Sequence, residues 1–209
     1  MPLLDSLDRV ATLTGVANTV LFDGGVRRGF NTDVAGIVRP LREAGALTLD
    51  QVVIFGGGAT AASALVASAE LGASSVLIWL RSPEKATGLQ QLGAELGVVV
   101  EARAFTDLGR GFGEPDAVIS TLPNGAVVDL VVPETARRNS ILFDVAYDPW
   151  PTALADAWAS VSAPVISGLE MLLAQALVQV RIFLSGDPTA ELPQEQRVVE
   201  AMRASVTVG

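Results

Sequence analysis

One stretch decides the fold of this chain: Val52-Val53-Ile54-Phe55-Gly56-Gly57-Gly58-Ala59-Thr60-Ala61-Ala62-Ser63. A short run of β-branched and aromatic residues stops at three glycines, and a segment rich in alanine and leucine continues to Leu71. This order predicts a buried strand, a tight turn and a helix. Because the first N–H groups of a helix lack intrahelical acceptors and the helix dipole favours negative charge there, the turn is a candidate anion site.

Composition and charge narrow the class of protein. With 209 residues, 50% of them hydrophobic and 18% charged, the chain has room for one large domain, or one domain plus a fragment, with a sizeable core. A net charge of −9 without a basic stripe makes it a poor binder of nucleic acid, whose phosphates dominate affinity. Cysteine and histidine are absent, which excludes disulfides, a thiolate nucleophile and a zinc site, and removes the commonest general base.

The sequence gives little indication of a membrane protein. The residues after Met1 contain neither a basic stretch nor a long apolar run, so we expect no signal peptide. The most apolar segment, 168–184, contains Glu170 and Arg181 and falls short of the ~20 apolar residues that a span needs. We interpret it as a buried helix and expect a soluble, cytoplasmic protein.

Before the glycine stretch the sequence predicts a helix at 4–13, strands at 16–22 and 26–31, and a helix at 34–41. The residues between the two strands, Asp23-Gly24-Gly25, suit a hairpin turn that needs positive φ. Asp33 is placed to cap the helix that follows it. A domain boundary is expected within 33–50.

After the glycine turn, further strands are expected at 75–80, 98–100, 116–120, 140–145 and 164–166. Helices are expected at 83–96 and from Leu169, and a final amphipathic helix within 189–208. Continuously apolar strands that alternate with helices predict a parallel sheet covered on both faces. The expected fold is therefore α/β with a doubly wound, Rossmann-type sheet.

The glycine turn also fits a dinucleotide-binding pattern, Gly56-x-Gly58-x-x-Ala61, in which Gly57, Ala59 and Thr60 fill the variable positions. Gly56 would make the tight turn, Gly58 would let the backbone approach a pyrophosphate, and Ala61 would allow close packing of helix on strand. Three glycines could also form a plain turn. The strand before and the helix after them favour phosphate binding.

The end of the next strand bears on the choice between NAD and NADP. An NAD site usually has an acidic residue there, whereas an NADP site has an arginine near the 2′-phosphate. Here the strand is followed by Arg81 and Ser82, with Lys85 one turn onward and no acid at the strand end. The alternative is that Arg81 and Lys85 are surface charges partnered by Glu84. We favour NADP as the cofactor.

Five spaced motifs stand in order along the chain: Ala17-Asn18-Thr19-Val20, Gly29-Phe30-Asn31-Thr32-Asp33, Leu80-Arg81-Ser82, Asp144-Val145-Ala146-Tyr147-Asp148-Pro149, and Gly168-Leu169-Glu170-Met171-Leu172 with Gln175. They resemble the A-V-N-T-V, G-x-N-T-D, N-R-T, D-x-x-Y-x-P and G-x-x-M-L-x-x-Q segments of shikimate dehydrogenases of aromatic amino-acid biosynthesis. Leu80 stands where the family usually has Asn. The resemblance runs along nearly the whole chain.

The resemblance implies an oxidoreductase that transfers hydride between 3-dehydroshikimate and shikimate with NADP, in chorismate biosynthesis. It implies that Asn18 and Asp33 bind substrate hydroxyls, with Asp33 catalytic, and that Tyr147 and Gln175 close over the substrate. The residues implied to line the nicotinamide pocket are Thr121, Val145, Gly168 and Met171. Taken alone, Asp33 would more often belong to a helix cap, and Tyr147 and Gln175 to packing or the surface.

The family comparison also divides the chain. It assigns 1–33 to the end of a substrate-binding domain, 34–50 to a linker helix, 51–188 to an NADP-binding domain and 189–209 to a C-terminal helix and tail. The part of the family's substrate domain that contains its Ser-x-Ser motif has no counterpart in this chain. The lysine that pairs with the N-T-D aspartate is also missing, because Lys85 is the only lysine and aligns with the cofactor side. General acid–base groups contribute roughly 10²–10⁴-fold, so we expect an N-terminally truncated family member with impaired catalysis.

Two alternatives stay open. The chain could be a non-catalytic NADP-binding module, or a quinate/shikimate dehydrogenase-like paralogue, since quinate-specific relatives share these motifs. The expected ligand is shikimate or a related small polyol acid, and neither nucleic acid nor a membrane is an expected partner. The hairpin within 16–31 would expose a sheet edge and an apolar face, which predicts a homodimer or aggregation through this surface.

Overall fold

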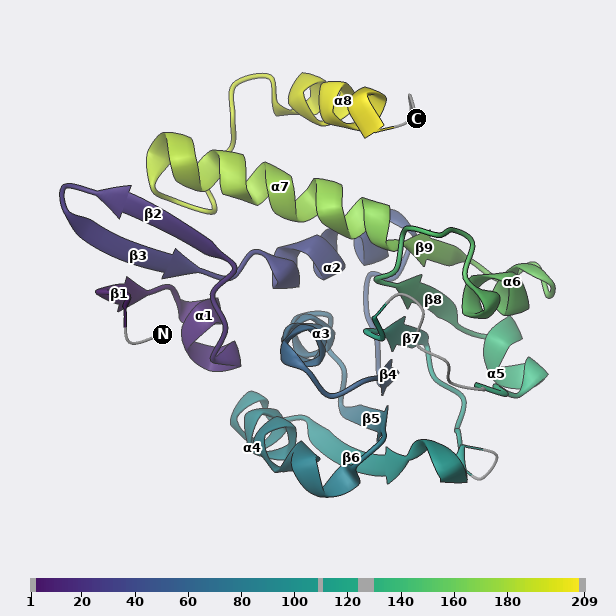
Figure 1. Cartoon of the computed structure of the whole chain (residues 1–209). Coiled ribbons are helices and arrows are strands. Elements are labelled where there is room, and N and C mark those ends of the chain that lie inside the picture. The colour runs from purple at the N-terminus through teal and green to yellow at the C-terminus, as the bar shows by residue number, and fades with distance from the viewer. Residues whose placement is uncertain (1–2, 109–110, 124–129, 207–209) are drawn as a thin grey trace.

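The computed structural model describes residues 3–108, 111–123 and 130–206. They contain two sheets (Figure 1). A three-stranded sheet near the N-terminus has the order β1-β3-β2, and a six-stranded sheet has the order β6-β5-β4-β7-β8-β9. The predicted α/β class is confirmed.

The small sheet is built from β1 (Ser6–Leu7), β2 (Thr19–Asp23) and β3 (Val26–Phe30), with α1 (Arg9–Thr14) between the first two strands. The predicted hairpin is confirmed, because β2 pairs antiparallel with β3 and Gly24 and Gly25 adopt φ values of 56° and 86°. The helix predicted over 4–13 is wrong at its start. There β1 pairs with β3, and Asp8 starts α1 by accepting a hydrogen bond from the Ala11 N–H.

The large sheet consists of β4 (Gln51–Phe55), β5 (Ser75–Leu80), β6 (Val99–Ala104), β7 (Ala117–Ser120), β8 (Ile141–Asp144) and β9 (Val165–Ser167), paired in parallel throughout. Numbered from β4, their spatial order is 3-2-1-4-5-6, which is the doubly wound order of dinucleotide-binding folds. The order reverses between β4 and β7, and such sheets bind ligands beyond the carboxyl ends of the strands at this point. The glycine turn therefore lies where a ligand is expected.

Helices cover both faces of this sheet. On one face, α3 (Ala59–Glu70) and α4 (Thr87–Leu96), which follows the 3₁₀ turn η1 (Pro83–Ala86), share a core with Val52 and Ile54. On the other face, α5 (Glu134–Arg138), α6 (Ala153–Ala159) and the segment after the 3₁₀ turn η2 (Phe105–Asp107) share a core with Val53 and Phe55. Neither α5 nor α6 is expected from the sequence, because five and seven residues are too few to show a helical period.

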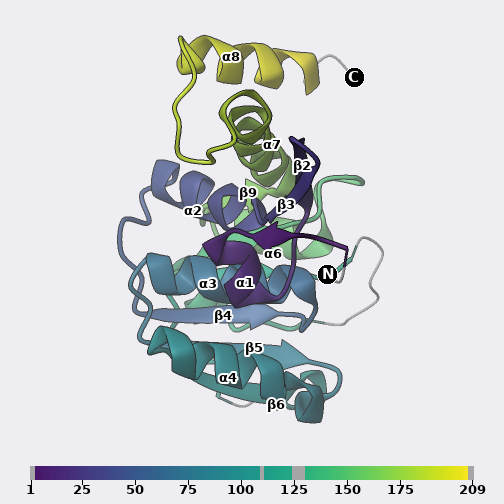
Figure 2. The ribbon, with the colours of Figure 1, turned by 90° about the vertical axis from the view of Figure 1, so that its left-hand side faces the viewer.

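Three helices stack above the sheet layer: α2 (Asp33–Glu43), α7 (Gly168–Ser185) and, outermost, α8 (Glu195–Val206) (Figures 1 and 2). By length and composition alone α7 could cross a membrane, but the core helix of a soluble protein passes the same test. The predicted buried helix is confirmed on one side of α7, where Leu177 and Ile182 are buried, whereas Phe183 and Leu184 on the other side are exposed. The predicted final helix begins only at Glu195.

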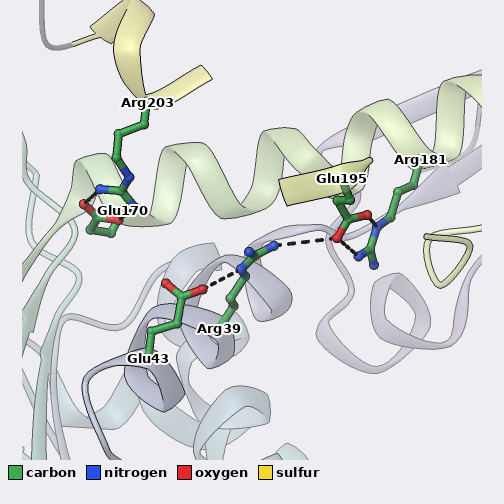
Figure 3. Close-up of polar contacts among 6 residues, drawn as sticks. All are labelled: Arg39, Glu43, Glu170, Arg181, Glu195 and Arg203. Carbon is green, nitrogen blue, oxygen red and sulfur yellow. Dashed lines mark hydrogen bonds and ion pairs between the residues drawn. The ribbon is translucent and has the colours of Figure 1, made fainter. Parts of the chain in front are cut away.

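Charged side chains attach α8 to the helices beneath it (Figure 3). The Arg181 guanidinium binds the Glu195 carboxylate through two hydrogen bonds of 2.8 and 2.5 Å, and Arg203 binds Glu170 through two of 2.5 and 2.6 Å. Arg39 of α2 also approaches Glu195 at 4.0 Å. α8 has no fully buried residue, so these ion pairs add to the contacts of its half-buried apolar residues Val198, Val199 and Met202.

Candidate functional site

Two glycines of the turn differ in the space around them: a side chain would fit at Gly58 but not at Gly56. Gly56 has a φ of 109°, and a Cβ there would lie 2.4 Å from the Thr121 hydroxyl, so only glycine fits. Gly58 has an extended backbone that any residue adopts, and a Cβ there would meet no atom within 4 Å. The fold itself therefore requires Gly56 but not Gly58. The free space in front of Gly58 suits a ligand that approaches the backbone closely.

The start of α3 offers unpaired donors beside this space. Gly58 is the N-cap, and its carbonyl accepts hydrogen bonds from Ala61 and Ala62. Within the described residues, no acceptor faces the backbone N–H groups of Ala59 and Thr60, and the first turn of α3 contains no acidic residue. Such N–H groups bind phosphate at helix starts. The residues present therefore fit the pyrophosphate of a dinucleotide, and Ala61, fully buried, packs the helix against the sheet.

Arg81, Ser82 and Lys85 follow β5 directly. Arg81 and Lys85 are exposed and Ser82 is half-buried. The alternative pairing with Glu84 is not found: none of these charged side chains forms an ion pair with any residue that the structure describes. The Ser82 carbonyl accepts the Lys85 N–H at 3.0 Å, which turns the chain back over the strand end. Their charges are therefore available to an anionic ligand.

The predicted nicotinamide-pocket residues lie beyond the neighbouring strand ends. The Thr121 hydroxyl donates to the Phe55 carbonyl at 2.8 Å, and the Val145 N–H donates to the Ser120 carbonyl at 3.0 Å. A Cβ on Gly168 would lie 1.9 Å from the Val145 carbonyl oxygen, so α7 begins in direct backbone contact with the chain after β8. Met171, one turn on, is buried.

Asn18 and Asp33, which are predicted to bind substrate hydroxyls, are hydrogen-bonded to each other. The Asn18 Nδ2 donates to the Asp33 carboxylate at 2.7 Å. The Asn18 Oδ1 accepts from the Thr19 hydroxyl at 2.9 Å and from the Thr32 N–H at 3.1 Å, so the amide can point its NH₂ only toward Asp33. One Asn18 N–H and the second Asp33 oxygen have no partner within the described part of the chain. This pair can recognise vicinal hydroxyl groups.

The environment of Asp33 changes its acidity. Burial of the carboxyl raises its pKa above the ordinary range, and the hydrogen bond from Asn18 partly opposes the increase. Among the described residues Asp33 forms no ion pair. A carboxyl whose pKa moves toward neutral pH suits proton transfer. The expectation that Asp33 caps α2 is wrong: Asp33 is the first residue of the helix, and the Asn31 side chain accepts its N–H instead.

Gln175 lies close to this pair, and Tyr147 is less constrained. A Cβ on Gly36 of α2 would lie 3.2 Å from the Gln175 Cβ, so the two helices cross in close contact there. Asp33 is three residues before Gly36 and shares its helix face, which brings it toward Gln175. Tyr147 is 50% exposed and makes no hydrogen bond to Asn18, Asp33 or Gln175. The structure thus joins Asn18 to Asp33 and places Gln175 at a helix crossing one turn beyond Asp33.

The roles of two supporting residues, Thr32 and Asn31, are not predicted from the motifs. Thr32 orients the Asn18 amide through its N–H and hydroxyl, and Asn31 holds the start of α2. Both belong to the Asn31-Thr32-Asp33 motif, but their roles depend on residues distant in sequence. Among the described residues, no group of three carboxylates could hold a metal ion.

The sheet order, the glycine turn at the reversal point and the unpaired helix start define a dinucleotide-binding α/β protein. No family model matches the chain. The shikimate dehydrogenase (NADP(+)) of Methanothermobacter thermautotrophicus is 31% identical over 198 residues, which are 92% of this chain and 70% of that protein. The chain belongs to the shikimate dehydrogenase family.

Solved structures agree with this assignment. The crystal structure of Mycobacterium tuberculosis shikimate dehydrogenase matches with a TM-score of 0.79 and 33% identity, over 98% of this chain and 73% of that one. The quinate dehydrogenase of Corynebacterium glutamicum in complex with NAD matches with a TM-score of 0.82 and 25% identity, over 98% and 73% of the two chains. This chain therefore spans about 70% of the length of the relatives that it matches.

Proposed function

We propose that this protein is an NADP-dependent oxidoreductase that transfers hydride between 3-dehydroshikimate and shikimate. The observation that carries the proposal is the oriented Asn18–Asp33 pair, which lies at the start of α2 beside the helix crossing that brings in Gln175. Amide and carboxylate groups bind hydroxyls, which a polyol acid such as shikimate supplies. The relative from Methanothermobacter, named for NADP(+), supports the cofactor assignment.

The cofactor would be held by residues that follow the ends of five strands, β4, β5, β7, β8 and β9. The N–H groups of Ala59 and Thr60 would bind the pyrophosphate in front of Gly58, and Arg81, Ser82 and Lys85 would bind the 2′-phosphate. Thr121, Val145, Gly168 and Met171 would surround the nicotinamide. When bound, NADP accepts or supplies the hydride.

Asp33 would handle the proton in this reaction. When shikimate is oxidised, the reacting hydroxyl loses its proton to the Asp33 carboxylate while the carbon loses a hydride; in the reverse reaction Asp33 returns the proton. Asn18 would hold Asp33 and a neighbouring substrate hydroxyl, and Gln175 and Tyr147 would cover the substrate. We expect slow turnover, because the only lysine, Lys85, lies on the cofactor side and histidine is absent.

A spectrophotometric assay of NADP-dependent shikimate oxidation tests the proposal. Turnover that Asp33→Asn abolishes supports it, and a Glu95→Gln variant of an exposed carboxylate far from Asp33 serves as the control. The same assay with quinate chooses between the two substrates, because a quinate dehydrogenase is among the structural relatives. If kcat/KM is higher with quinate than with shikimate, quinate is the substrate and the proposal of shikimate is wrong.

A non-catalytic NADP-binding module is the second candidate. It is favoured by one observation: among the described residues the Asp33 carboxylate has only the Asn18 side chain as a partner and no cation. Tight NADPH binding in calorimetry, with no turnover of shikimate or quinate at high enzyme concentration, would establish this function and refute the first.

We propose that the protein acts in the cytoplasm as a homodimer. In the small sheet β2 is an edge strand, and Phe22 on it is 76% exposed. Leu184 at the end of α7 is 73% exposed. Edge strands pair readily with a second chain, and a two-fold axis would bring two β2 strands together. Light scattering at high concentration tests this: dimer mass lost in Phe22→Lys supports it, and a monomer in the parent protein contradicts it.

A further inference from the structure

Asn31 makes more hydrogen bonds than a helix cap requires. Its side chain is 5% exposed. The Oδ1 accepts from the N–H groups of Asp33 at 3.0 Å and Val34 at 3.4 Å, which caps α2. The Nδ2 donates in other directions, to the Thr14 hydroxyl at 3.1 Å, the Val16 carbonyl at 3.2 Å and the Ser63 hydroxyl at 3.2 Å. Both ends of the amide are therefore engaged, and its orientation is set.

These bonds join three elements that are distant in sequence. Thr14 ends α1, Asp33 begins α2, and Ser63 lies in α3, the helix that starts at the glycine turn. Both ribbon views place α1 and α2 beside α3 (Figures 1 and 2). Ser63 is itself fully buried, so its bond to Asn31 is shielded from water. The Asn31 amide thus links the backbone N–H of Asp33 directly to α3, the helix that begins at the glycine turn.

We propose that Asn31 is a positioning residue that holds Asp33 at a set place relative to the cofactor helix α3, through its hydrogen bond to Ser63. The proposal rests on the proposed function, because it gives Asn31 a role in aligning substrate with cofactor. Asn31 contacts neither ligand itself; it acts through the backbone of Asp33. Capping uses only Oδ1, whereas the link to α3 uses only Nδ2, so the two roles can be separated.

The matched pair Ser63→Ala and Ser68→Ala makes this separation without a change of charge. Both serines are fully buried in α3. The Ser68 hydroxyl donates only to the Ala64 carbonyl of its own helix, at 2.7 Å, whereas Ser63 accepts from Asn31. Removing either hydroxyl leaves the cap of α2 intact. Ser63→Thr retains the hydroxyl and serves as the conservative rescue.

The first readout is the titration of Asp33 in ligand-free protein, followed by carboxyl ¹³C NMR. Asp8, whose carboxylate accepts the Asn31 backbone N–H at 3.4 Å, is a second titrating group in contact with Asn31 and is followed in the same spectra. In Ser63→Ala we expect the Asp33 midpoint to fall toward the ordinary aspartate range, because a loosened helix start admits water. We expect Ser68→Ala to keep the parent midpoint and Ser63→Thr to restore it.

The second readout is substrate and cofactor binding. We expect the KM for shikimate to rise about fivefold to tenfold in Ser63→Ala, as for the loss of one buried hydrogen bond, with NADPH affinity within twofold of the parent. A Ser63→Ala protein that matches Ser68→Ala in both the Asp33 midpoint and the KM overturns the proposal. If the parent binds no shikimate but the Asp33 midpoint still falls only in Ser63→Ala, the proposed function fails and the positioning role stands.

Discussion

The side-chain amide of Asn18 donates a 2.7 Å hydrogen bond to the carboxylate of Asp33, across a separation of fifteen residues in sequence. The hairpin β2–β3 makes this contact, since it returns the chain so that the start of α2 lies beside the residue before β2. The bond favours the ionised form of Asp33, and burial of the same carboxyl disfavours it more strongly. The ionised form of Asp33 therefore lowers the stability of the folded protein.

Asp33→Asn should raise the thermal stability of the protein at neutral pH and abolish turnover. The pKa of Asp33 is raised in the folded state, so the ionised carboxylate destabilises the fold at a pH above that value. As the pH falls through the folded pKa, the parent gains a proton and recovers this stability. The difference in Tm between variant and parent should therefore shrink on acidification, as calorimetry from pH 7.5 to pH 4 would measure. A difference that grows toward low pH would contradict it.

Gly58→Ala and Gly56→Ala should separate ligand binding from folding. At Gly58 a Cβ enters open space with an unstrained backbone, so we expect an unchanged Tm and a loss of at least tenfold in NADPH affinity. At Gly56 a Cβ clashes with Thr121 in a left-handed backbone, which should destabilise the fold by about 1–3 kcal/mol. Denaturant unfolding and calorimetric titration measure the two effects. Unimpaired NADPH binding by Gly58→Ala would remove the pyrophosphate from this position.

Arg81→Ala should change the choice of cofactor. A charge-assisted bond to the 2′-phosphate is worth about 1.5–3 kcal/mol, so NADPH affinity should fall roughly tenfold to a hundredfold while NADH affinity stays the same. The control is Arg42→Ala, because Arg42 is also an exposed arginine but lies on α2. Calorimetry with both cofactors gives the comparison. If the parent binds NADH and NADPH equally, Arg81 has no part in selecting NADP.

Glu195→Gln should loosen α8. Arg181 lowers the pKa of Glu195, so the ionised pair stabilises the fold above the ordinary glutamate pKa and the stabilisation is lost as the pH falls through the lowered folded value. The pair is largely shielded from solvent, and its loss should cost roughly 1–3 kcal/mol. The protection of amides in 195–206 against hydrogen exchange, relative to the intrinsic exchange rate at the same pH, should then fall, and likewise in the parent at acidic pH. Equal exchange in Glu195→Gln and the parent would show that the half-buried apolar residues hold α8 instead.

The central fold could be predicted from local sequence because its signals are local. The apolar strand that ends at Gly56 and the further apolar strands that alternate with helices predict a parallel sheet. Because the crossovers between parallel strands are right-handed, few strand orders are then possible. The start of α1 was mispredicted because Ser6–Leu7 is a strand only by virtue of its pairing with β3. Helices α5 and α6 are not predicted, because so few residues cannot show the 3.6-residue spacing of apolar side chains that marks a helix.

The sequence by itself determined the strand, the glycine turn at Gly56 and the helix that follows it, and the basic residues after β5. It also determined the family, through five motifs in order. Only the tertiary structure decided which residue caps α2, how the Asn18 amide is turned, and that Asn31 reaches Ser63 on α3. The physical reason is that a side-chain amide has donors and acceptors in several directions, and only the packed chain fixes which partners, up to 32 residues away, it meets.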